Sequence, residues 1–235
     1  MLKKHRIVKE KNKLIKLLPG HIRSIDDRQL LTNFIELDPI FAGDRLKFDI
    51  VGTRIKWQKD VIKHVGIEGY WMEFGVREGL SIGWVLEERP NQEMHGFDSW
   101  EGLPEAWNVG SKVFEKGDMN VDMPQFDPNI HLWKGWFEDT IDPWKEHHKG
   151  NIAYLHIDSD LYSSANCVLT KLNDRIVPGT LIVFDELINF RLSGKMKFWY
   201  EHEWKALCEW LEKYQRKIEP VARTCMYQAA CKVIV

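Results

Sequence analysis

Residues 69–79 read GYWMEFGVREG, and the interpretation of the whole chain starts from this stretch. Tyr70–Phe74 is a short apolar run, typical of a buried strand, and it stops at a turn that contains two glycines. The next stretch, Ser81–Glu88, repeats its apolar residues at helical spacing. Residues 69–88 are therefore predicted to form a strand, a glycine turn and a helix, a unit common in α/β folds.

The same alternation of strand and helix signals continues to the end of the chain. Further strands are predicted at Met94–Phe97, Ile130–Lys134, Ile152–Ile157, Leu181–Phe184, Ile218–Val221 and Ala229–Val235. Pro178 and Gly179 are interpreted as a turn before one of them. Alternating strands and helices are typical of a mostly parallel sheet with helices on both faces. We therefore predict an α/β, Rossmann-like, doubly wound fold.

The chain length limits the number of domains. A chain of 235 residues suits one sizeable α/β domain. Residues 1–65 are polar and helical in pattern, and we expect an N-terminal helical extension there, followed by the main domain in residues 66–235. Basic residues gather in the first thirty positions, and a solvated helix face is favoured over a contact with an acidic partner.

Composition and charge restrict the classes of partner. The formal net charge of −2 gives no electrostatic case for nucleic acid or an anionic membrane. No apolar run is long enough to span a bilayer, and no secretory signal is apparent. The four cysteines lack metal-like spacing and are expected to be reduced, as in a cytoplasmic protein. A homo-oligomer is compatible with the sequence.

Acidic residues recur where the predicted strands end, and this recurrence is the main functional signal. Glu73, Asp98, Asp158 and the pair Asp185–Glu186 all stand at or beside the carboxyl end of a predicted strand. Open parallel sheets bind their ligands outside these ends, near the point where the strand order reverses. The sequence therefore predicts an acidic ligand site at one edge of the sheet.

The glycine turn and the next acidic residue indicate the kind of cofactor. A dinucleotide fingerprint would need another glycine where Arg77 stands, so NAD is disfavoured. S-adenosylmethionine (SAM) has no pyrophosphate, and Asp98 could accept hydrogen bonds from both hydroxyls of its ribose. Taken alone, Glu73 or Asp98 is equally well explained as a helix cap or a surface charge. The two together favour SAM.

Four segments together resemble one family. They are residues 73–81 (EFGVREGLS), 96–104 (GFDSWEGLP), 156–164 (HIDSDLYSS) and 178–186 (PGTLIVFDE). These segments are similar to the macrocin O-methyltransferase family, whose members methylate sugar hydroxyls of macrolide and aminocoumarin antibiotics. The resemblance implies a class I SAM-dependent methyltransferase fold, with a seven-stranded sheet whose last strand is antiparallel.

The resemblance also implies the residues of a cofactor site. Contacts with SAM are expected at Glu73, Gly75, Ser81, Asp98, Ser99 and Asp158. Residues 134–140 (KGWFEDT) resemble the family segment that would place Asp139 near the adenine. The competing explanation for Glu138 and Asp139 is an acidic pair at the start of a helix.

The expected chemistry is assisted by magnesium. A sugar hydroxyl is a poor nucleophile near neutral pH, and a bound divalent ion lowers its pKa and orients it. Asp158, Asp185 and Glu186 could supply the oxygens that Mg²⁺ prefers, and such close carboxylates call for a cation. The family has an acidic pair after strand five, which is Asp-Asp in some members and Asp-Glu here. Whether Glu186 binds the metal directly is therefore left open. The resemblance makes Asp160 the general base, and an Asx-turn is the alternative.

The acceptor and the surrounding loops are less determined. Leu103–Pro128 is rich in Pro, Gly, Asn and Asp, and we expect a mobile lid there. Trp100, Trp107 and Trp136 are candidates for stacking on adenine or a sugar, whereas Trp204 and Trp210 are expected in the core. Residues 201–203 (EHE) are interpreted as a solvated helix face. The function predicted is O-methylation of a sugar-like small molecule; the alternatives are a nitrogen, phenol or nucleic-acid acceptor, or a SAM-binding module without turnover.

Overall fold

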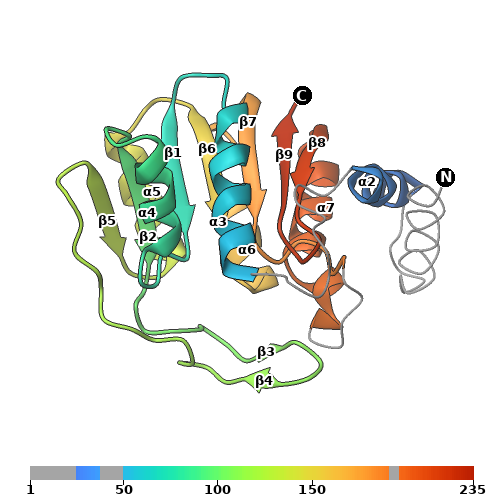
Figure 1. Cartoon of the computed structure of the whole chain (residues 1–235), viewed down its shortest axis with the longest axis horizontal. Helices are drawn as coiled ribbons and strands as arrows, with labels where there is room; N and C mark the ends of the chain where they lie inside the picture. The colour runs from blue at the N-terminus through green and yellow to red at the C-terminus, as the bar shows by residue number, and fades with distance from the viewer. Residues whose placement is uncertain (1–24, 38–49, 191–195) are drawn as a thin grey trace.

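A seven-stranded sheet forms the centre of the computed structural model (Figure 1), in which residues 25–37, 50–190 and 196–235 are described. The basic residues before position 25 lie outside this description. In chain order the elements are α2 (Ile25–Glu36), α3 (Ile50–Val61), η1 (Ile62–His64), β1 (Tyr70–Phe74), α4 (Leu80–Glu88), β2 (Met94–Asp98), β3 (Trp107–Asn108), β4 (Val113–Phe114), β5 (Ile130–Lys134), α5 (Phe137–His147), β6 (Ile152–Ile157), α6 (Tyr162–Lys171), β7 (Ile176–Phe184), η3 (Trp199–Glu201), α7 (Glu203–Lys213), β8 (Ile218–Arg223) and β9 (Ala229–Val233).

The order of the strands confirms the predicted doubly wound sheet. Across the sheet the order is β5-β2-β1-β6-β7-β9-β8. The first five are mutually parallel, and β9 runs antiparallel to both β7 and β8. The strand order reverses at β1, since β2 lies on one side of it and β6 on the other. The carboxyl ends of β1 and β6 therefore flank the place where such sheets bind ligands.

One strand begins earlier than the sequence predicted. Pro178 and Gly179 were interpreted as a turn, but both lie inside β7. The pairing with β6 jumps from Ile176 opposite Ile152 to Leu181 opposite Tyr154, so the intervening residues form a bulge. Within it the Thr180 hydroxyl donates to the Ile152 carbonyl at 2.7 Å, which replaces a bond of the interrupted ladder.

Two hydrophobic cores lie on opposite faces of the sheet, because successive strand residues point to opposite sides. One core joins the sheet to α3 and α4, with Trp57 and Val85 fully or almost fully buried. The other joins it to α5, α6, α7 and α2, with Trp204 and Trp210 each 1% exposed. Figure 1 shows α3 and α4 in front of the sheet. The expectation that Trp204 and Trp210 are core residues is confirmed.

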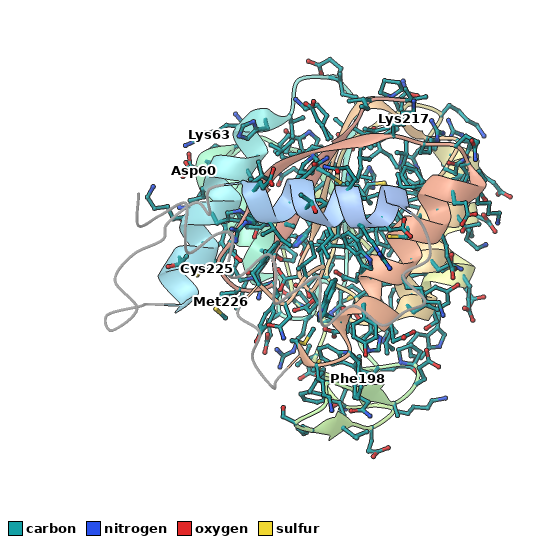
Figure 2. The ribbon with its side chains drawn as sticks, turned by 90° about the vertical axis from the view of Figure 1, so that its right-hand side faces the viewer. Asp60, Lys63, Phe198, Lys217, Cys225 and Met226 are labelled. Atoms are coloured by element: carbon teal, nitrogen blue, oxygen red, sulfur yellow. The ribbon has the colours of Figure 1, made fainter. Side chains whose placement is uncertain are left out.

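The helices before residue 65 are packed into both cores. Trp57 of α3 is 1% exposed, and Phe34 of α2 is fully buried against the other face. The Arg223 side chain of β8 donates to the carbonyls of Ile35 and Leu37, at 3.1 and 3.0 Å, and so satisfies orphan groups at the end of α2. Figure 2 shows α2 lying across the sheet edge. Among the described residues, the boundary expected at residue 65 does not separate two packing units.

The described helices, all short, include none that is both long enough and apolar enough to cross a membrane.

A buried histidine stands near the start of β2, at the end of the sheet away from the ligand edge. His95 accepts a hydrogen bond from the indole of Trp133 at 3.3 Å and stacks on His131. Burial, followed by the nearby His148 and His131, lowers the pKa of His95 to about 3. The folded protein therefore keeps this imidazole neutral through the pH range in which an unfolded chain protonates it.

We predict that His95 makes folding stability fall as the pH drops below 6.5. The pKa of His95 is lower in the folded protein than in the unfolded chain. Its contribution to the free energy of unfolding is therefore fully present above pH 6.5 and is lost progressively as the pH falls toward 3. Between pH 7 and 5 this single group costs about 2 kcal/mol of unfolding free energy. Urea denaturation at both pH values should show a smaller drop for His95→Gln than for the wild type. The control is His64→Gln, at an exposed histidine outside the group around His95; an equal drop in all three proteins would disprove the assignment.

Candidate active site

A cavity of about 640 Å³ opens at the carboxyl ends of the parallel strands. Its walls come from the turn after β1, the end of β2, the start of α5, and the ends of β6 and β7. Of the predicted site residues, the wall includes Gly75, Ser81, Asp98, Ser99, Asp158, Asp160, Asp185 and Glu186. The volume lies in the range of small-molecule sites. The structure thus brings most of the predicted residues to one cavity.

The turn after β1 requires a glycine at its first position. Gly75 has φ +92°, and a Cβ atom there would fall inside the contact distance of the Asp158 carbonyl oxygen. The Gly75 N–H donates to Phe97 of β2, and the Asp158 N–H donates to Phe74 of β1, each at 2.9 Å. The backbone of the turn is therefore fixed directly against the end of β6.

Glu73 lies beneath the cavity and supports its wall. The side chain is fully buried, and Ser81, which does line the cavity, donates its hydroxyl to Glu73 Oε1 at 2.6 Å. Glu73 Oε2 lies 2.8 Å from Nδ1 of His156. Burial opposes charge on His156, but the neighbouring carboxylates of Asp185 and Glu73 raise its pKa to about 10. Glu73 is thus engaged by protein partners and is not part of the cavity wall, and its expected contact with SAM stays a prediction.

Asp98 orders two strained backbone positions at the cavity wall. Its two oxygens accept the N–H groups of Arg77 and Trp100, each at 2.8 Å. Both residues have positive φ, 51° and 57°, a conformation that side chains other than glycine rarely adopt. The Trp100 indole donates to the Arg77 carbonyl at 3.0 Å and lies outside the cavity wall, so it is not placed for stacking. Trp107 and Trp136 do line the wall.

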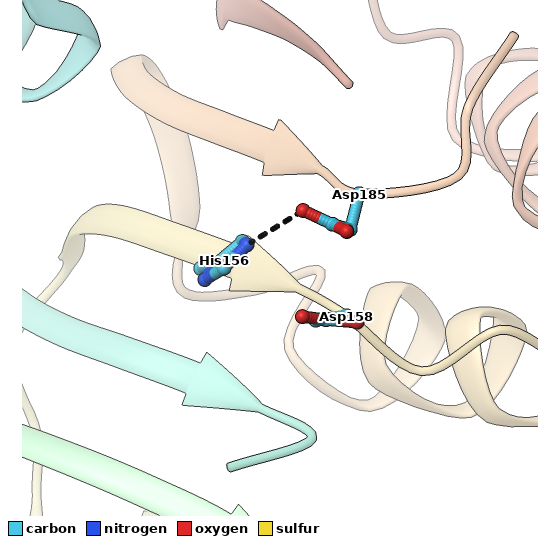
Figure 3. Close-up of side chains that lie close together, drawn as sticks. All are labelled: His156, Asp158 and Asp185. Atoms are coloured by element: carbon cyan, nitrogen blue, oxygen red, sulfur yellow. Dashed lines mark ion pairs between the residues drawn. The ribbon is translucent and has the colours of Figure 1, made fainter. Parts of the chain in front are cut away.

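Acidic side chains from β6 and β7 face one another across the strand ends. Asp158, Asp160 and Glu186 each offer an oxygen, and these three atoms lie within 4.8 Å of one another. His156, Asp158 and Asp185 form a second group within the same limit, and Figure 3 shows these three side chains together. Asp158 belongs to both groups. The predicted convergence of carboxylates at adjacent strand ends is therefore present.

A cation that was not predicted from the sequence, Arg54, compensates part of this charge. Arg54 of α3 places Nη2 at 2.7 Å from Asp158 Oδ2 and 2.8 Å from Asp185 Oδ1. Asp185 also accepts a hydrogen bond from Gln228 at 3.3 Å. Burial opposes charge on the Asp185 carboxylate, but Arg54 and His156 lower its pKa to about 2. An arginine in a segment interpreted as an extension carries no local signal of this role.

Asp158 shares Arg54 with Asp185, whereas Asp160 and Glu186 have no ion-pair partner among the described residues. Burial, followed by Asp185, raises the pKa of Asp158 to about 6 in spite of Arg54. Burial and the neighbouring carboxylates raise the pKa of Asp160 and of Glu186 well above the ordinary range. Within the described part of the chain, Glu186 Oε2 is buried without a hydrogen-bond partner. This side of the cavity is short of positive charge.

Glu203 supports the strand ends from behind. Its carboxylate accepts the Glu186 N–H at 3.0 Å and the Ser159 N–H at 3.5 Å. The side chain is fully buried at the first position of α7. The interpretation of residues 201–203 as a solvated helix face is therefore wrong for Glu203. Adjacent polar residues in a sequence do not reveal which of them meets the backbone of a distant strand.

Asp139 is not brought to the cavity. It is exposed in the first turn of α5, where its N–H donates to the Trp136 carbonyl at 3.0 Å. The neighbouring Glu138 lines the cavity instead. The helical rotation between the two residues separates them, and both are acids in the first turn of α5. A contact between Asp139 and adenine stays a prediction.

The segment predicted to be a lid contains a short hairpin. β3 and β4 pair antiparallel, with Trp107 opposite Phe114 and the two rings stacked at 5.3 Å. Leu103, Trp107 and Val109 form a small hydrophobic cluster with Leu161 and Met196. Figure 1 shows the hairpin beyond the strand ends. The segment therefore has more internal packing than its composition indicated; its mobility stays a prediction.

The fold and the site together define a class of protein. A seven-stranded sheet with one reversed strand, a glycine turn after β1 and an acidic residue after β2 are the features of the class I methyltransferases. Residues 72–187 match a family model described as a methyltransferase domain. The chain contains this domain and is a methyltransferase, as the motifs predicted.

Solved structures of similar fold support this class. CalS11, a calicheamicin methyltransferase, is 18% identical with a TM-score of 0.61, over 96% of this chain and 91% of that one. The O-methyltransferase NovP is 17% identical with a TM-score of 0.56, over 100% and 99% of the two chains. The apo form of CalS11, described as a TDP-rhamnose 3'-O-methyltransferase, has a TM-score of 0.54 at 18% identity, over 96% and 93%. At these identities the likeness establishes the fold. No curated protein sequence matches the chain significantly.

We predict that Gly75→Ala destabilises the protein. The new methyl group meets the Asp158 carbonyl, and alanine disfavours the positive φ, so the unfolding free energy should fall by about 2 kcal/mol or more. Gly83→Ala is the matched control, because a Cβ there has no atom within 4 Å and the residue lies inside α4. It should be neutral or stabilise by about 0.5–1 kcal/mol. Equal stability of the two variants in urea denaturation would show that the contact is not tight.

Proposed function

We propose that the protein is a SAM-dependent O-methyltransferase, assisted by Mg²⁺, whose acceptor is a hydroxyl of a sugar or a glycosylated small molecule. The observation that carries the proposal is the group of carboxylates from Asp158, Asp160 and Glu186 at the cavity wall. The same cavity is lined on its other side by the glycine turn and Asp98. A methyl donor and a hydroxylated acceptor held on these two walls would meet inside one cavity.

The cofactor wall is formed by Gly75, Ser81, Asp98 and Ser99. SAM supplies a methyl group bound to a sulfonium when it occupies such a wall. Gly75 allows close approach to the backbone, because it has no side chain. Asp98 already accepts one backbone N–H on each oxygen, and each oxygen retains capacity for a ribose hydroxyl. The backbone bonds hold the carboxylate in one orientation before any ligand arrives.

The acidic wall has the donor chemistry of a magnesium site. Its ligands are hard oxygens, one of them unpaired and buried, and the wall has an excess of negative charge. Asp158, Asp185 and Glu186 are the ligands that the sequence predicted, and Asp160 stands in the all-carboxylate group with two of them. A bound Mg²⁺ would lower the pKa of the acceptor hydroxyl. The carboxylate set fits that ion, with Asp185 the least free because Arg54 and Gln228 already engage it.

Asp160 is proposed as the general base. It lines the cavity two residues after Asp158, and its φ of 61° turns the chain away from the strand direction there. In the transfer one C–O bond forms, one C–S bond breaks, and the hydroxyl proton must leave the acceptor. Asp160 is positioned to accept that proton at a carboxylate oxygen on the cavity wall.

The acceptor class rests on the walls and on the similar structures. Trp84, Trp107 and Trp136 line the cavity, and indole rings offer flat apolar faces of the kind that cover sugar rings. CalS11 is described as acting on TDP-rhamnose. We infer a small hydroxylated acceptor of this kind, with neither nucleic acid nor membrane as partner. A panel of glycosides, nucleotide sugars, phenols and amines, assayed with SAM, tests the class directly; turnover confined to phenols or amines would contradict it.

We predict that Asp98→Asn weakens binding of S-adenosylhomocysteine without unfolding the protein. Loss of charge on the oxygens that face the ribose should reduce affinity between about tenfold and a hundredfold. Asp139→Asn is the control, since Asp139 is exposed and outside the cavity wall. Isothermal calorimetry measures both, and NAD should give no heat with the wild type. If Asp139→Asn were the damaging change, the adenine contact first expected from the sequence would be right.

We predict that Asp160→Asn retains binding of S-adenosylhomocysteine but lowers kcat by a factor on the order of 10²–10⁴, the usual contribution of a general base. Treatment of the wild type with EDTA should abolish turnover and leave cofactor binding largely intact, because the carboxylates serve the acceptor. Added Mg²⁺ should restore activity. Full turnover in EDTA would remove the metal from the mechanism, and normal turnover of Asp160→Asn would remove the base.

A further inference from the structure

Arg54 occupies the position between two carboxylates that a bound cation would take. A single nitrogen, Nη2, contacts Asp158 and Asp185, at 2.7 and 2.8 Å, although the two acids follow different strands. The guanidinium also lies 5.6 Å from the ring centre of Trp84. The side chain is 31% exposed and lines the cavity, so it is accessible to a ligand that enters from solvent.

The hydrogen bonding of the Arg54 guanidinium between these acids is incomplete. Within the described residues, its Nε is buried and has no hydrogen-bond partner. Among the described residues, the guanidinium therefore makes both of its carboxylate contacts through one of its three nitrogens, and does not form the two parallel bonds of a bidentate carboxylate pair. A buried N–H without a partner costs free energy. Release of Arg54 from this position would relieve that cost and lose two charged contacts.

A divalent ion and Arg54 would compete for the same oxygens. Asp158 is shared between the group that contains Asp185 and the group that contains Asp160 and Glu186. Arg54 carries one positive charge and reaches only the first group. A divalent ion in either group would lie close to the guanidinium, and like charges at short range in a partly buried site repel strongly.

We propose that Arg54 is an internal cation that exchanges with the divalent ion. Without metal, Arg54 holds Asp158 and Asp185 together; when metal binds, Arg54 gives up at least its contact with Asp158. Arg54 thereby sets the affinity of the site for metal and is a positioning residue. This inference rests on the metal site of the proposed function, but it concerns a residue on α3 that belongs to neither ligand group.

Binding of Mn²⁺ to the full chain tests the exchange without any assay of turnover. Free Mn²⁺ is measured by electron paramagnetic resonance in titrations of the wild type, Arg54→Gln, Arg54→Lys and Arg89→Gln. Arg89→Gln is the matched control, since Arg89 also lies over a tryptophan ring, 5.0 Å from that of Trp71, and lines no part of the cavity. We expect Arg54→Gln to bind Mn²⁺ about tenfold tighter or more, the effect of removing one like charge beside a divalent ion. Arg54→Lys should lie between it and the wild type, and Arg89→Gln should match the wild type.

Other outcomes separate the two proposals. Equal or weaker Mn²⁺ binding by a folded Arg54→Gln would overturn the exchange while leaving the metal site intact. Absence of Mn²⁺ binding by all four proteins would overturn the metal site and the exchange with it. If Arg54→Gln does not fold, the Nε–Hε resonance of Arg54 in ¹⁵N-arginine-labelled wild type decides: a shift on addition of Mg²⁺ supports the exchange, and an unchanged resonance in protein that binds Mg²⁺ overturns it.

Discussion

The close contact between the turn after β1 and the end of β6 is the constraint on which the site depends. Gly75 leaves no room for a side chain beside the Asp158 carbonyl, and the Asp158 N–H donates to Phe74 at the end of β1. The wall that suits the cofactor and the wall that carries the acids therefore meet at one point. The parallel pairing of β1 with β6, where the strand order reverses, makes this contact possible.

A chain of alternating charges runs beneath that contact and joins the two walls. Glu73 contacts His156, His156 lies 3.9 Å from Asp185, and Asp185 and Asp158 share Arg54. Each of these five groups thus has an opposite charge beside it, which is the condition under which ionised groups are tolerated in a protein interior. The alternation ends at Asp158, and the acids beyond it have no further cation in the described structure.

The local sequence patterns predicted the strands and helices well, because each element has its own characteristic spacing of apolar residues. Tyr70–Phe74 and Ile152–Ile157 were predicted with the bounds observed. What could not be predicted depends on contacts between distant residues. Arg54 acts 104 positions from Asp158, and Glu203 supports the backbone of a strand end 44 positions away. Asp139 lies outside the cavity wall whereas its neighbour Glu138 is part of it, a difference of one residue of helical rotation that a motif does not encode.

Asp158 serves both walls through different atoms, and this division has a chemical consequence. Its main chain contacts the glycine turn, while its side chain faces Arg54 and the acidic group. The main-chain contact depends on strand pairing and not on the charge of the side chain. The cation beside the carboxylate can therefore change without moving the cofactor wall. In the proposed function, acceptor activation and cofactor binding would therefore be adjacent in space but largely independent in energy.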